Sequence, residues 1–237
     1  MLNTNKLLGQ GSYGCVYYPG IDCKANSKKN SKYVTKIQES DNASKNEIYI
    51  SKIIRKNIKD YDKYFIVIVK HCKISVNKLH DKQDNLFNQC EFLENLNYLF
   101  YRNVNDIYLT YSRYLQGSEF LLHYNHYYNK RIEYLDYIGI IENYRRLNYS
   151  CNLLSSNNIV HNDMHSSNLM IKKSNNKIYI IDFGLAYVYS NKKNNIKQNF
   201  DAFFISSNSE FNIRLDHCFN KLFYRYITYL ITKGQFI

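Results

Sequence analysis

The stretch Ile159–Ala186 reads IVHNDMHSSNLMIKKSNNKIYIIDFGLA and decides the fold. It contains two short strand candidates, Leu169–Lys172 and Lys177–Ile181, with apolar and β-branched residues in both. Between them, Ser174-Asn175-Asn176 is typical of a turn. The sequence therefore predicts a β-hairpin whose open end is flanked by polar residues on both sides.

Three of these polar residues are Asp163, Asn168 and Asp182. A hairpin would bring them to one edge, where an amide and a carboxylate offer the hard oxygen ligands that Mg²⁺ prefers. We predict that Asn168 and Asp182 hold the metal, which leaves Asp163 to orient or deprotonate a hydroxyl. A turn-rich hairpin with solvated Asp and Asn is the plainer alternative.

The same residues resemble the protein-kinase catalytic loop, H-R-D-x-x-x-x-N, followed by D-F-G. Here the order is His161-Asn162-Asp163, then Asn168, then Asp182-Phe183-Gly184. The resemblance covers residues 7 to about 205 and implies an α+β, bilobal protein-kinase-like fold. It implies that residues 1–115 form a β-rich, ATP-binding N-lobe that also contains the kinase αC helix. A mainly helical, truncated C-lobe would follow over residues 116–237.

The segment Leu7–Tyr18, LLGQGSYGCVYY, carries a G-x-G-x-x-G pattern at Gly9, Gly11 and Gly14. A dinucleotide-binding fingerprint must open a helix, but β-branched and aromatic residues and then Pro19 follow here. Strand–loop–strand is the better interpretation, and it resembles the kinase Gly-rich loop with Val16 in its usual apolar place. No G-K-[ST] occurs in the chain, which excludes a P-loop NTPase.

The segment Lys32–Gln38 alternates like a strand. Within it, Val34-Thr35-Lys36 resembles the end of the kinase V-A-I-K strand, with Lys36 as its lysine. A helical apolar pattern follows over Ser40–Lys56, preceded by a capping Asp41 or Asn42. By the resemblance, Lys36 holds the α- and β-phosphates of ATP, and Glu47 on the helix positions Lys36.

Further strands and helices are expected along the chain. Tyr64–Val69 predicts an apolar strand, residues 71–105 are part strand and part helix, and Ile132–Leu154 predicts a long helix. Ile107–Gly117 resembles the strand and hinge between kinase lobes, where Arg113 to Leu115 would contact the adenine. The two His of residues 123–130 are interpreted as a surface turn, because no carboxylate or Cys accompanies them.

After Ala186 the resemblance weakens. Asp201 would take the part of the kinase αF Asp, and Leu215–Ile231 predicts a closing helix. The peptide-docking A-P-E is absent. Asn162 replaces the usual Arg of H-R-D, and His165 replaces the Lys that is typical of Ser/Thr kinases.

Composition restricts the possible classes of protein. The formal net charge of +12 fits binding to nucleic acid or to an acidic protein, but the abundance of Lys, Asn, Ile and Tyr favours compositional bias. An AT-rich genome, such as that of a large DNA virus, would produce this bias. No apolar run reaches the roughly 18 residues that a membrane span requires, and no signal peptide is visible.

The six Cys show no C-x-x-C spacing, so reduced thiols in an intracellular, cytoplasmic protein (or a virion) are expected.

The resemblance implies a Mg²⁺- and ATP-dependent serine/threonine protein kinase with a protein substrate. Asp163 would orient the acceptor hydroxyl. Two enzymatic alternatives stay open: a small-molecule kinase of the aminoglycoside or choline type, and the atypical kinase of the tRNA-modifying KEOPS complex. A nucleotide-binding pseudokinase is the non-enzyme alternative, against which the intact Lys36, Asp163 and Asp182 argue.

Overall fold

The computed structural model describes residues 5–11, 14–23, 31–82, 89–98, 106–119 and 134–189. The chain divides into two compact units: Met1–Ile53 with Val67–Tyr114, and Ile54–Ile66 with Leu115–Ile237. Strands and helices occur in both, which confirms the α+β class. The His-rich segment 123–130, Asp201 and the helix expected over Leu215–Ile231 lie outside the described residues.

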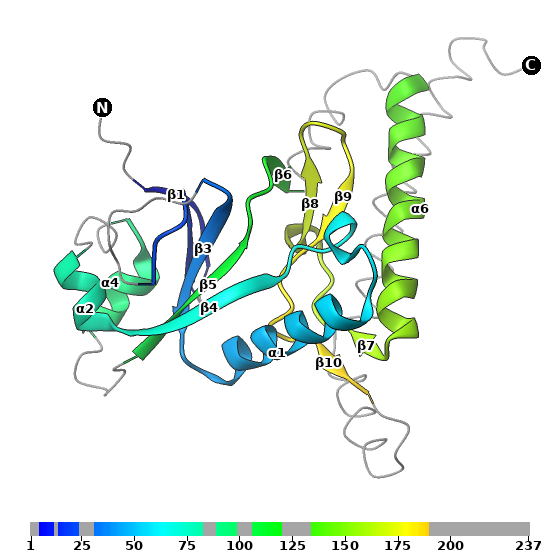
Figure 1. The fold of residues 1–237 in the computed structure, drawn as a ribbon. Helices are drawn as coiled ribbons and strands as arrows, with labels where there is room; N and C mark the ends of the chain where they lie inside the picture. Colours follow the sequence, from blue (N-terminus) through cyan, green and yellow to red (C-terminus); the bar gives the residue numbers. More distant parts are fainter. Residues whose placement is uncertain are drawn as a thin grey trace, which may run out of the picture. The chain divides into compact units, whose positions relative to one another are not determined.

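The first unit is built on a five-stranded sheet in the order β1-β2-β3-β5-β4, in which every neighbouring pair is antiparallel (Figure 1). The strands are β1 (Lys6–Gly11), β2 (Gly14–Tyr18), β3 (Tyr33–Glu39), β4 (Ile68–Ser75) and β5 (Asp106–Arg113). Among the described residues, its helices are α2 (Val76–Lys82), α4 (Glu91–Tyr98) and α1 (Asn42–Asn57), whose last turn, from Ile54, belongs to the second unit. The segment 71–105, expected to be part strand and part helix, contributes most of β4 together with α2 and α4.

Helix α1 begins where the sequence predicts. The Asp41 carboxylate accepts the backbone N–H of Ser44 at 2.7 Å, and the Ser44 hydroxyl donates to the Asp41 carbonyl at 3.1 Å. This cap satisfies an amide that the first helical turn leaves without a partner. Ile50 and Ile54 are fully buried on one face of the helix.

The strand expected over Tyr64–Val69 is displaced along the chain. β4 begins only at Ile68 and runs to Ser75. Phe65 instead forms a parallel bridge with Ile180, and the Ile66 N–H donates to the carbonyl of the same Ile180 at 3.0 Å. Pairing with a distant segment therefore decides where the first half of this apolar run lies, and a local pattern cannot reveal such pairing.

Two disulfides lie in the first unit, so the expectation of reduced thiols is wrong for four cysteines. Cys15 on β2 is bonded to Cys90, which precedes α4, and their Cα atoms are 6.2 Å apart. Cys23 is bonded to Cys72 on β4, with Cα atoms 5.9 Å apart. The partners are 75 and 49 residues apart in sequence. Sheet pairing brings them together, which no short spacing motif encodes.

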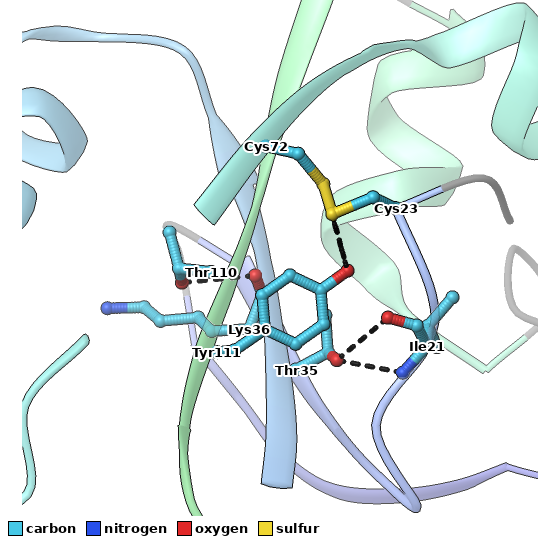
Figure 2. The surroundings of a disulfide bond; sticks show 7 residues. All are labelled: Ile21, Cys23, Thr35, Lys36, Cys72, Thr110 and Tyr111. Atoms are coloured by element: carbon cyan, nitrogen blue, oxygen red, sulfur yellow. Dashed lines mark hydrogen bonds between the residues drawn. A yellow bond between two sulfur atoms is a disulfide. The ribbon is translucent and has the colours of Figure 1, made fainter. Parts of the chain in front are cut away.

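Hydrogen bonds fix the segment after β2 near the Cys23–Cys72 disulfide (Figure 2). The Tyr111 hydroxyl donates to Cys23 Sγ at 3.4 Å. The Thr35 hydroxyl accepts the Ile21 N–H at 2.8 Å and lies 3.4 Å from the Ile21 carbonyl, to which it can donate. Burial raises the pKa of the Tyr111 phenol well above its ordinary value, so it remains a donor.

The second unit contains the long helix α6 (Tyr134–Ser156) and the antiparallel hairpin β8 (Leu169–Lys172) and β9 (Ile178–Ile180). β6 (Gly117–Glu119) pairs with β8, and β10 (Tyr187–Val188) pairs with β7 (Ile159–Val160). Among its described residues there are also two short 3₁₀ turns, η1 (Tyr61–Lys63) and η3 (Ser166–Asn168). The helix and the hairpin are both near their expected positions, and Figure 1 shows the hairpin beside α6.

Two side chains of α6 fix the hairpin. The buried Asn143 amide donates to the Asn176 carbonyl at 2.7 Å and accepts the Ile178 N–H at 2.9 Å. Arg146 donates to the Ile178 carbonyl at 3.0 Å and to the Lys63 carbonyl. Its guanidinium lies over the Tyr64 ring, 4.6 Å from the centroid. The turn of the hairpin is therefore bonded to a rigid helix.

Candidate active site

The first unit brings together Lys36 on β3 and Glu47 on α1. Lys36 Nζ lies 3.1 Å from Glu47 Oε2, and the Gln38 amide donates to the same oxygen at 3.2 Å. Glu47 is 7% exposed and Gln38 is 3% exposed, whereas the Lys36 side chain is 24% exposed. One buried carboxylate oxygen thus holds two donors, and the ammonium group keeps access to solvent. The sequence analysis missed Gln38, whose signal is its place two residues after Lys36 on the same strand face.

The Gly-rich segment is an antiparallel hairpin, in agreement with the strand–loop–strand interpretation. Gly11 is paired with Gly14, and Gly9 with Val16. Gly14 has φ 154°, and a Cβ atom there would run into the Ile37 carbonyl oxygen. Only glycine satisfies both conditions. Gly9 and Gly11 are exposed and have no neighbour within 4 Å of the place where a Cβ would lie.

The register aligns two of the predicted nucleotide-binding residues across the sheet. Val16 lies opposite Lys36, and Lys36 lies opposite Thr110. Directly paired residues of antiparallel strands project to the same face. Val16 therefore lies beside the Lys36 side chain on one face of this sheet.

The two expected hinge residues are near the boundary between the units. Arg113 is the exposed last residue of β5, opposite Tyr33, and Leu115 is a buried residue that opens the second unit's main segment. Between them, the Tyr114 N–H donates to the Lys32 carbonyl at 3.0 Å.

The second unit brings together the other group of predicted residues. The Asn168 amide nitrogen donates to the Asp163 carbonyl oxygen at 2.8 Å and to Asp163 Oδ2 at 3.0 Å. The Asn168 carbonyl accepts the Ile181 N–H at 3.0 Å, so Asn168 lies beside the residue that precedes Asp182. The hairpin thus places all three polar residues at one end, as the sequence predicts.

Backbone conformation sets the direction of the chain on both sides of this site. Asn162 has φ 62° and Asp182 has φ 58°, values of the left-handed region, which Asn and Asp adopt more readily than most residues. The Asp182 carboxylate accepts the N–H of Gly184 through Oδ1 at 3.2 Å. This bond stabilises the turn that follows Asp182.

His161 connects the Asp163 loop with the strand end that leads into Asp182. Its Nδ1 accepts the Asp163 N–H at 3.3 Å, so in the neutral ring Nε2 carries the proton and donates to the Ile181 carbonyl at 2.9 Å. Burial lowers the pKa of His161, which keeps the ring neutral. The ring packs against Phe183 with centroids 4.8 Å apart. In the sequence, His161 is noted only as the first residue of the His161-Asn162-Asp163 motif. In the structure it bonds both Asp163 and the residue before Asp182.

A family model for protein tyrosine and serine/threonine kinases matches residues 2–206. The chain belongs to this kinase family. The kinase-like fold and a phosphotransferase activity follow from this membership, since the match covers most of the chain. Comparison with curated proteins finds no significant match.

The kinase match does not bear on the expected source in a viral or other AT-rich genome, which stays a prediction. Among the helices of the described residues, none combines the length and apolar character needed to cross a membrane.

Proposed function

We propose that this kinase transfers the γ-phosphate of ATP to a serine or threonine hydroxyl of a protein, with Mg²⁺ as cofactor. The observation that carries the proposal is the pair of hydrogen bonds from Asn168 to Asp163 at the hairpin end that leads into Asp182. Family membership supports a kinase of either tyrosine or serine/threonine type. Asn162 occupies the position of the H-R-D arginine. His165 occupies the position of the lysine that is typical of serine/threonine kinases.

The proposed lobes are residues 1–115, which bind ATP, and 116–237, which carry the catalytic loop. In the first, Lys36 binds the α- and β-phosphates and Glu47 holds its ammonium group in place. The remaining nucleotide contacts are proposed for Gly9, Gly11, Gly14, Val16, Arg113 and Leu115. Open backbone at Gly9 and Gly11 supports this assignment, because amide N–H groups bind phosphate oxygens when no side chain intervenes.

Asn168 and Asp182 fit a magnesium site by the chemistry of their donor atoms. Since the Asn168 amide nitrogen is directed at Asp163, its amide oxygen is the group left to bind a cation. A carboxylate and an amide oxygen are ligands suited to Mg²⁺. Bound Mg²⁺ would neutralise phosphate charge. The chain's own contribution is to hold these two ligands at one hairpin end.

Asp163 is the proposed residue that orients the acceptor hydroxyl. Its carboxylate is one-third exposed, so a hydroxyl can approach it, while Asn168 restrains its rotation through Oδ2. Positioning of this kind accounts for much of the rate enhancement in phosphoryl transfer.

We test the metal role by thermal shift. ATP with Mg²⁺ is expected to stabilise the protein more than ATP alone, and Asp182→Asn should abolish the difference while leaving the unliganded melting temperature within about 2 °C. Asp62→Asn is the matched control, because Asp62 is an exposed carboxylate in η1. An equal shift with and without Mg²⁺ in the unsubstituted protein would remove the metal from the proposal.

The acceptor is tested separately with labelled ATP and three substrate panels: basic proteins, acidic proteins and amino-alcohols. Label on serine or threonine of a protein is the expected result. Label on an amino-alcohol alone would establish the small-molecule kinase instead. ATP binding with no transfer to any panel, or to water, would favour the pseudokinase. A cytoplasmic location stays a prediction, and with two disulfides present cysteine usage no longer supports it.

A further inference from the structure

His165 occupies a place beside Asp163 that the proposed function does not use. Its Nε2 lies 3.6 Å from Asp163 Oδ2 and 3.1 Å from the Asn168 amide nitrogen. Its Nδ1 accepts the backbone N–H of Ser167 at 3.3 Å. The ring is about half exposed, so it is not part of a core. Its contacts are made with the polar groups of the catalytic loop.

The bond to Ser167 fixes the tautomer of this ring. A backbone N–H can only donate, so Nδ1 must be unprotonated. In the neutral ring the proton is then on Nε2. The Asn168 amide nitrogen is also a donor, so the 3.1 Å approach of the two nitrogens is tolerated only when both protons are directed at a shared acceptor. Asp163 Oδ2 is the group that both face: it accepts a hydrogen bond from the amide at 3.0 Å and lies 3.6 Å from the ring nitrogen, an electrostatic contact longer than a hydrogen bond.

We propose that His165 is a positioning residue that, with Asn168, holds Asp163 Oδ2 from two sides and so turns Asp163 Oδ1 towards the acceptor hydroxyl. The inference rests on the proposed function of Asp163. A lysine at this position would offer a mobile charge. The imidazole offers a directed N–H whose orientation the Ser167 amide sets. Among the described residues, the hydrogen bond from Asn168 and the closer contact from His165 both reach the Asp163 carboxylate at Oδ2.

Two isosteric substitutions separate positioning from a general structural effect. The amide nitrogen of His165→Gln reaches the place of Nε2, whereas the amide of His165→Asn reaches only that of Nδ1. We expect His165→Asn to lower kcat of ATP turnover about tenfold, because the ring N–H that faces the charged Asp163 carboxylate is lost. His165→Gln should stay within about threefold. The KM for ATP should be unchanged in both, because His165 does not touch the nucleotide in this proposal. His71→Asn is the matched control, since His71 is exposed on β4.

Equal losses of kcat in the Gln and Asn variants, or a rise in KM for ATP instead, would overturn the proposal. A second measurement does not depend on activity. Long-range ¹H–¹⁵N spectra of the neutral ring, assigned by the loss of signals in His165→Gln, should show the Nε2–H tautomer. Asp163→Asn should shift the Nε2 resonance, and Asp62→Asn should not.

The Nδ1–H tautomer, or an Nε2 resonance that ignores Asp163→Asn, would refute the contact. Should the protein turn over no ATP at all, the proposed function fails, and the spectra alone still decide whether His165 holds Asp163.

Discussion

Removal of the two disulfides should destabilise the first unit strongly, and the structure gives the magnitude. The bridges are nested, because Cys23–Cys72 lies within the loop closed by Cys15–Cys90. Closing the inner loop of 49 residues removes unfolded-state entropy worth about 4 kcal/mol in the chain-entropy model. Once that loop is closed, the outer bridge closes only about 26 further residues (75 less 49) and contributes about 3.5 kcal/mol.

Measured bridges contribute about 2–4 kcal/mol each, so the loss of both should cost at least about 4 kcal/mol. A domain's whole stability is about 5–15 kcal/mol. We therefore expect the melting temperature of the double variant Cys23→Ser/Cys72→Ser to fall by at least about 8 °C. The further loss of Cys15 and Cys90 should cost about as much again. The matched control is Cys151→Ser, because Cys151 is a free cysteine on α6 and its substitution leaves both bridges intact.

The assay combines calorimetry with thiol counting. Unreduced protein, unfolded in guanidinium, should show two reactive thiols, from Cys151 and from Cys218, which lies outside the described residues. Six reactive thiols, one from each cysteine of the sequence, would show that the bridges do not form and would refute the reasoning. Two reactive thiols in the unreduced protein would show that the bridges form. If reduction then left the melting temperature unchanged, the entropic argument would be refuted.

The remaining predictions concern the Lys36–Glu47 pair and the Cys151 thiol. Lys36→Met should lower phosphotransfer by about a hundredfold, as for the loss of a transition-state charge contact; retained activity would remove Lys36 from the nucleotide site. Glu47→Gln should lower it less, because Glu47 only positions the lysine. Burial raises the pKa of Cys151 to about 11 from an ordinary value of 9.0. In a Cys218→Ser background, alkylation at about pH 8 should therefore be about a hundredfold slower than for an exposed thiol, and fast labelling would contradict this.

Local patterns account for the parts of this fold that were predicted correctly. The β8–β9 hairpin, the Gly-rich hairpin and the cap of α1 each depend on a few adjacent residues: turn formers, glycines and an Asp before a helix. Because Asn168 and Asp182 flank the two strands of one hairpin, their convergence followed from the strand assignment alone. The Lys36–Glu47 contact was reached through the family resemblance.

The features that were missed depend on residues far apart in sequence. The disulfide partners meet only after sheet pairing, and β4 begins later than expected because Phe65 and Ile66 pair with Ile180. The role of the buried Asn143 also depends on distant residues, the backbone of Asn176 and Ile178, which no helical periodicity encodes.

Side-chain bonds to the backbone fix the polar residues of the second unit. Asn143 fixes the turn of the β8–β9 hairpin, and at the other end His161 bonds both the Asp163 N–H and the Ile181 carbonyl. Each of these bonds is formed by a buried, neutral group, so none of them depends on the charge that phosphate or Mg²⁺ would bring. The arrangement of Asp163 and Asn168 is therefore a property of the folded chain itself, and a ligand that binds there meets donors and acceptors already in place.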